Sequence, residues 1–191
     1  MRFLAFAAGA IAAALITSPA GAAWKDLALP ELGVGKEFPG DPKRDASEYK
    51  TPVAGAAKAT VLSLTEDNIV YKLTVVELQH KVDVSASIFG ECVNMAENEG
   101  EVLANTATRV EPAAQAVYGR LVTVNLKGDK GRKQTACSFT KGRLYKIEAI
   151  VLPEHGQPNS SQAIRFTNSV RFDLERNWAE VEDNLDAVPA P

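Results

Sequence analysis

The sequence has few of the side chains on which most enzyme and metal chemistry depends. It holds two histidines and two cysteines in 191 residues, and aromatic residues make up 7%. It contains no Cys-x-x-Cys pair, no His-x-x-x-His and no carboxylate ladder, which argues against a structural zinc or an EF-hand calcium site. We therefore predict no metal ligand and no cofactor.

Catalytic and phosphate-binding motifs are also missing. The Gly-x-Ser-x-Gly turn typical of many serine hydrolases does not occur, and the segment at 128–133 (GDKGRK) lacks the spacing of a phosphate loop. We predict no catalytic residue and no enzyme. Two alternatives stay open: a hydrolase with an unfamiliar site at His80 or His155, and a metal-handling or envelope stress factor with a weak site at His80 and Asp83.

An excess of positive charge is absent. The formal net charge is −3, whereas nucleic acids and anionic membranes require a basic surface, so neither is predicted as a partner. The basic residues do gather locally, at Lys127, Lys130, Arg132 and Lys133, with Arg120 and Arg143 placed on neighbouring strands. This group is either a docking patch for an acidic partner or, the favoured interpretation, a solvated β-turn.

Long apolar runs are missing except at the start of the chain. A positive beginning is followed by an uncharged apolar stretch at 3–16, then by Ser18-Pro19 and the small residues 20–23. This order is typical of a secretory signal peptide, and the apolar stretch is shorter than the ~20 residues of a spanning helix. We predict a signal peptide at 1–22, no membrane span after its cleavage, and a periplasmic or secreted bacterial protein.

The two cysteines are predicted to form one disulfide. The periplasm is oxidising, and Cys92 and Cys137 are the pair available after signal cleavage. A bridge across this separation would stabilise the fold by roughly 3–4 kcal/mol in the chain-entropy model. Two buried free thiols and a reactive thiol are the alternatives.

Alternating apolar residues predict a sheet. The segments Ala57–Thr65 and Ile69–Leu78 flank a polar turn and predict a hairpin. Three later segments joined by short turns predict an antiparallel meander: Gly119–Leu126, Arg132–Phe139 and Arg143–Leu152. Further short strands are predicted at Gly33–Phe38, Arg44–Tyr49, Val102–Val110 and Val170–Leu174.

Two segments change to helical periodicity. Asp83–Asn98 places Ile88, Phe89, Cys92, Val93 and Ala96 on one face, and Ser161–Ser169 predicts a second, shorter helix. The fold class that follows is α+β, an antiparallel β-sheet covered by helices. We predict a single domain at 23–175 and a disordered acidic and Ala/Pro-rich tail at 176–191.

Several short motifs resemble those of one known family. They are GVGKEFPGDPK (33–43), NIVYKLTVVEL (68–78), YGRLVTVNL (118–126), GRLYKIEAIVLP (142–153) and AIRFTNSVRF (163–172). Together they resemble the PsbP family, which comprises the lumenal extrinsic subunit of photosystem II and its prokaryotic relatives. The resemblance covers about 33–174. It implies an α-β-α sandwich around an antiparallel sheet. The motif residues also have a physical interpretation, in which Tyr145 and Phe166 are large apolar anchors between helix and sheet.

The resemblance also bears on function. Members of that family are largely non-catalytic accessory or binding proteins, which implies an exported accessory protein whose partner is another envelope protein or a small ligand. The cysteine pair departs from the family's core pattern, and the partner-contacting N-terminal segment of the photosystem subunit is not recognisable in this chain. A photosynthetic role is therefore not expected, and the sequence specifies neither the partner nor the oligomeric state.

Overall fold

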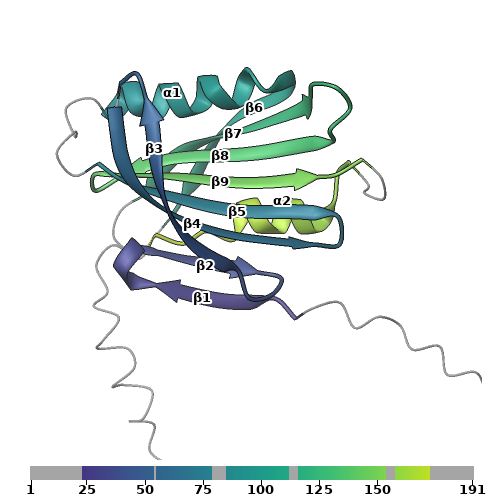
Figure 1. The fold of residues 1–191 in the computed structure, drawn as a ribbon, viewed down its shortest axis with the longest axis horizontal. Coiled ribbons are helices and arrows are strands. Elements are labelled where there is room, and N and C mark those ends of the chain that lie inside the picture. The colour runs from purple at the N-terminus through teal and green to yellow at the C-terminus, as the bar shows by residue number, and fades with distance from the viewer. Residues whose placement is uncertain (1–22, 54, 79–84, 112–115, 154–157, 173–191) are drawn as a thin grey trace, which may run out of the picture.

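The computed structural model describes residues 23–53, 55–78, 85–111, 116–153 and 158–172 (Figure 1). The strands are β1 (Lys25–Leu29), β2 (Val34–Phe38), β3 (Lys43–Thr51), β4 (Gly55–Glu66), β5 (Ile69–Glu77), β6 (Gly100–Val110), β7 (Val117–Leu126), β8 (Arg132–Thr140) and β9 (Arg143–Val151). The α-helices are α1 (Ser85–Glu97) and α2 (Ser161–Asn168), and a 3-10 turn, η1 (Pro30–Leu32), joins β1 to β2. The predicted signal peptide and C-terminal tail lie outside the described residues.

Seven strands form one sheet in the order β3-β4-β5-β9-β8-β7-β6, and β1 pairs with β2 in a separate sheet. Every neighbouring pair is antiparallel. The predicted hairpin is β4–β5, and the predicted meander is β7–β8–β9. An antiparallel sheet accompanied by two helices is therefore confirmed.

Local turn chemistry accounts for the hairpins. Asp67 and Asn68 link β4 to β5 with φ values of 47° and 65°, the left-handed conformation that two-residue hairpin turns require and that Asp and Asn tolerate best. Gly131, immediately before β8, has a φ of 103°. A Cβ at Gly131 would lie 2.0 Å from the carbonyl oxygen of Val151, so that position requires glycine.

Alternation along the strands divides the core into two clusters, one on each face of the sheet. On β5, the side chains of Tyr71, Leu73 and Val75 join the cluster that contains Phe166 of α2. The next residue, Val76, points to the other face and joins the cluster that contains α1. On the α2 face, the central strands are therefore apolar along most of their length. On the opposite face, they are apolar only where α1 crosses them.

The two helices lie on opposite faces of the sheet (Figure 1). α1 packs against β6 to β9, whereas α2 packs against β5, β8 and β9. The β1–β2 hairpin shares the α2 side, because Val34 and Phe38 belong to the same buried cluster as Phe166. The sequence predicted a cover made of helices, but a β-hairpin forms part of this layer.

Two short elements differ from the sequence prediction. β1 was not predicted, because its five residues show no clear alternation and it forms by pairing with β2. The predicted closing strand at 170–174 is, in its described part, a single bridge between Gly35 and Arg171. Among the described residues, no helix is long and apolar enough to cross a membrane.

Candidate functional site

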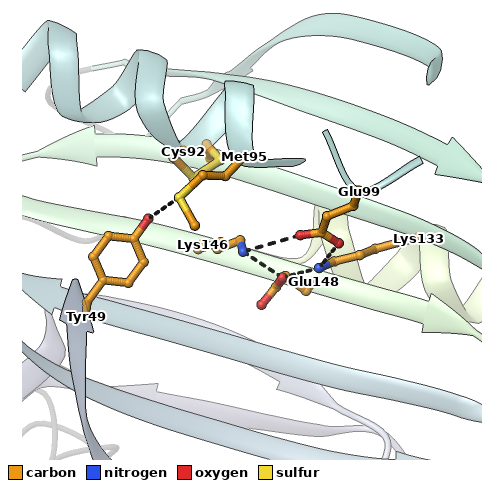
Figure 2. Close-up of a disulfide and its surroundings, with 8 residues drawn as sticks. Tyr49, Cys92, Met95, Glu99, Lys133, Lys146 and Glu148 are labelled. Carbon is orange, nitrogen blue, oxygen red and sulfur yellow. Dashed lines mark hydrogen bonds and ion pairs between the residues drawn. A yellow bond between two sulfur atoms is a disulfide. The ribbon is translucent and has the colours of Figure 1, made fainter. Parts of the chain in front are cut away.

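The structure places the two cysteines in contact through a disulfide between α1 and β8 (Figure 2). The Sγ atoms of Cys92 and Cys137 are 2.03 Å apart and the Cα atoms 6.3 Å apart. Both residues are fully buried. The bridge fastens the helix to β8, which lies directly beside the central strand β9. The burial of the bridge is what a structural role requires.

A buried cluster of ion pairs lies on the same face of the sheet as α1 (Figure 2). Glu148 Oε1 is 2.6 Å from Lys133 Nζ and 2.9 Å from Lys146 Nζ. Lys133 Nζ is also 2.6 Å from Glu99 Oε2, and Lys72 Nζ is 3.5 Å from Glu148 Oε2. The side chains of Glu148 and Lys133 are 3% and 8% exposed, so these charges interact in a region largely closed to water.

The cluster stabilises the charged forms of its members. Burial by itself would raise the pKa of Glu148, but the neighbouring Lys146 and Lys133 outweigh it and lower that pKa to about 2. Burial likewise opposes the charge on Lys133, yet Glu148 and Glu99 raise the pKa of its ammonium group. A carboxyl group with so low a pKa stays ionised near neutral pH, so Glu148 does not act as a proton donor there.

Beside this cluster, a polar contact joins the edge strand β3 to α1. The hydroxyl of Tyr49 donates to Met95 Sδ at 3.8 Å (Figure 2). Burial raises the pKa of Tyr49, and the carboxylates of Glu91 and Glu148 raise it further. Glu91 Oε2 and Glu148 Oε2 are buried and accept no hydrogen bond from the described residues.

The sequence offered no signal for this cluster. Lys133 lies on β8 between the polar residues Arg132 and Gln134, and Glu148 alternates with apolar residues on β9, a pattern typical of a solvent-facing side. Their partner Glu99 follows α1 in the chain. Opposite charges on two neighbouring central strands would indicate such a cluster. Recognising them requires the strand order, which the sequence alone does not give.

The structure separates the basic residues that the sequence grouped together. Lys133 belongs to the buried ion pairs, and Arg143 lies at the far end of β9, where its Nε is 3.1 Å from Glu77 Oε1. Arg120 is on β7, which is not adjacent to β9. The six residues therefore do not form one patch, because strand order and opposite ends of the strands keep them apart.

What remains at the Lys127–Arg132 turn is a surface of mixed charge. Lys127 and Arg132 line an open hollow of about 480 Å³ together with the acidic Glu101 and Asp129. Arg132 also donates to the side chains of Asn125 and Asn159. An acidic partner would meet both signs of charge at this turn.

The residues of the two alternative hypotheses cannot be placed. His80, Asp83 and His155 lie outside the described residues. Within the described ranges, no group of three His, Cys, Asp or Glu side chains is arranged to hold a metal ion.

A smaller hollow lies between the beginning of α1 and the adjoining ends of β7 and β8. It has a volume of about 290 Å³, and its lining includes Phe89, Tyr118, Phe139 and Arg120. Tyr118 is 67% exposed, with the guanidinium carbon of Arg109 5.8 Å from its ring centroid. Arg120 is held by the side chain of Asn105. The hollow therefore combines an exposed aromatic side chain with a positioned cation.

A second buried charge, Lys36 of β2, was also missed by the sequence analysis. Its ammonium group donates to the carbonyl oxygen of Phe166 and to Ser169 Oγ, and lies 4.0 Å from the centroid of the Phe166 ring. Burial lowers the pKa of Lys36 well below its ordinary value, with Glu37 opposing this effect and Arg171 adding to it. The residue ties the β1–β2 hairpin to the end of α2.

The fold is similar to that of a solved structure. That structure is cyanobacterial PsbP from Synechocystis sp. PCC 6803. The match covers 81% of this chain and 96% of that chain, with 15% sequence identity and a TM-score of 0.48. No protein-family pattern and no curated protein matches the sequence.

Proposed function

We propose that this chain is an exported, non-enzymatic accessory protein of the bacterial periplasm or cell exterior, and that it binds another envelope protein through the hollow at Tyr118. In this proposal the chain keeps the α-β-α sandwich of PsbP-like proteins, with α1 and α2 in the two outer layers. The aromatic hollow is the observation that carries the binding role.

Export is supported by the disulfide and by the start of the chain. A buried bridge between Cys92 and Cys137 suits a protein that folds in an oxidising compartment. The apolar stretch at 3–16, followed by small residues at 20–23, is the segment that would direct the chain there.

Binding is supported by the chemistry of the hollow. Tyrosine and arginine are enriched at protein interfaces, because an aromatic ring gives a large contact area and a guanidinium group gives directed hydrogen bonds. Among the large hydrophobic residues that the structure describes, Tyr118 has the highest exposed fraction. Arg120 and Phe89 lie beside it in the hollow. An apolar side chain of a partner would cover the rings.

Site-specific photocrosslinking in intact cells tests this proposal. A photoreactive benzoylphenylalanine replaces Tyr118 in one chain and Ile164 in a control chain; Ile164 is an exposed apolar residue of α2, on the other face of the sheet. We expect the first chain alone to form a discrete adduct with one envelope protein. Excess wild-type chain should abolish that adduct, whereas excess Tyr118→Ser chain should not.

Two results would contradict the proposal. One is a set of adducts equally strong from the two positions, which indicates random collisions. The other is an adduct that the Tyr118→Ser chain displaces as well as wild type, which removes the role of the aromatic ring.

A further inference from the structure

The two edges of the seven-stranded sheet are β3 and β6, and they differ sharply in charge. An edge strand presents unpaired backbone N–H and C=O groups that can pair with another chain, and charged side chains are a common protection against this. β3 carries five charged residues among its nine: Lys43, Arg44, Asp45, Glu48 and Lys50. Its edge is therefore protected.

β6 lacks this protection over most of its length. It is 11 residues long, and its two charged residues, Glu101 and Arg109, lie near its ends. The seven residues between them are uncharged, and Val102 and Leu103 are 44% and 43% exposed. Within the described part of the chain, β6 pairs with β7 alone, so its outer edge has no strand beside it.

A β-bulge at Leu103 limits the part of β6 that can pair regularly. The register with β7 shifts between Val102 and Ala104, and it is continuous from Ala104 to Val110. A bulge bends the strand and interrupts pairing on its outer side as well. The regular edge is therefore the seven-residue stretch Ala104–Val110.

We propose that two copies of this chain associate through their β6 strands, which pair antiparallel about a two-fold axis at Ala107. This register uses the whole regular stretch and extends the sheet continuously from one copy into the other. It places Ala107 opposite the same residue of the second copy, Thr106 opposite Thr108, and Ala104 opposite Val110. Small and β-branched side chains therefore meet across the interface.

The charges at this interface are complementary. The same register places Arg109 opposite Asn105 of the second copy. In each chain the Asn105 amide donates to Glu97 Oε1 of α1 at 2.6 Å, so a carboxylate lies beside the position that the guanidinium group reaches. No pair of like charges stands directly opposite in this register. Arg109 and Asn105 also contact Tyr118 and Arg120, so the interface adjoins the hollow proposed above.

Sedimentation equilibrium from micromolar to submillimolar concentration tests the proposal on the chain as cells process it. We expect wild type to have twice the mass of a single chain at the upper concentrations. Ala107→Glu places two carboxylates face to face at the axis while each lies beside Arg120 of its own chain. This change should raise the dissociation constant at least about tenfold. Ala46→Glu, at an exposed position on the other edge, is the matched control and should leave the mass unchanged.

A mixing experiment separates loss of the interface from loss of the fold. Ala107→Lys should also weaken the dimer, and an equimolar mixture of the Ala107→Glu and Ala107→Lys chains should restore it, because opposite charges then face each other. Denaturant unfolding checks that both variants are folded. A wild-type chain that is a monomer at every concentration would overturn the proposal. So would a dimer that Ala107→Glu leaves intact, or folded variants whose mixture stays monomeric.

Discussion

At the scale of single residues, the ion pairs of Glu148 are predicted to contribute most to stability among the charged side chains. Glu148→Gln would leave the buried Lys133 and Lys146 beside a neutral amide. We expect a loss of about 3 kcal/mol in the free energy of unfolding, measured by urea denaturation near neutral pH. Glu48→Gln removes an exposed pair with Lys50 and should cost less than about 1 kcal/mol.

The same variant has a pH signature. The pKa of Glu148 is about 2 in the folded chain against an ordinary value of 4.5. Because the folded pKa is the lower one, this contribution is complete above pH 4.5 and is lost as the pH falls toward 2. The stability difference between wild type and Glu148→Gln should therefore shrink over this range. A difference that stays constant would show that the ion pairs are not its source.

Lys36 should also make wild-type stability rise with pH, but at the alkaline end of the range. Burial lowers its pKa in the folded chain below the ordinary 10.5, so the unfolded chain binds more protons and wild-type stability rises with pH up to that value. Lys36→Met removes the titrating group. In urea unfolding at a series of alkaline pH values, the free energy of unfolding of wild type should rise relative to that of the variant as the pH rises. A difference between wild type and Lys36→Met that falls as the pH rises would contradict the account.

The apolar residues were predictable from the sequence and the buried charges were not. Tyr71 and Tyr145 lie on strands that alternation predicted, and both are buried in the core. Alternation is a local property of a strand. Glu148 also alternates with apolar residues, a pattern typical of a solvent-facing side, yet it is buried. Its burial depends on Lys133 and Glu99, which are distant in the sequence, so no local pattern reveals it.

At the scale of secondary-structure elements, the disulfide is predicted to hold α1 on the sheet. The bridge spans a sequence separation of 45 residues. Replacing both cysteines by alanine should lower the free energy of unfolding by roughly 3–4 kcal/mol. Wild type in reducing buffer should approach the stability of the double variant, as measured by urea denaturation. A double variant as stable as the oxidised chain would show that packing alone holds the helix.

The strands and helices with strong periodicity were predicted within a few residues of their observed ends. The hairpin β4–β5 and the meander β7–β8–β9 have polar turns that mark their limits, and α1 has a clear apolar face. β1 was missed because the contacts that stabilise it come from β2, not from its own sequence. The aromatic hollow was missed for a similar reason, since Phe89 and Tyr118 approach each other only when α1 lies on the sheet.

At the scale of the whole molecule, two buried charge systems and one covalent bridge connect separate parts of the fold. Lys36 joins the β1–β2 hairpin to α2, the Glu148 cluster joins three strands to the end of α1, and Cys92–Cys137 joins α1 to β8. Among the described residues, the surface then presents a sparsely charged sheet edge at β6 and an aromatic hollow at Tyr118. These two features are where we propose contacts with other chains.

The central claim is that the chain is exported and folds with its two cysteines bridged. The intact mass of the protein, recovered from the cell envelope under non-reducing conditions with its thiols alkylated, tests this most directly. The account predicts a chain that begins at Ala23 or Trp24, carries no alkyl group, and is lighter than the reduced form by the two hydrogen atoms lost in forming the bridge. A chain that retains residues 1–22, or one alkylated at both cysteines, would contradict it.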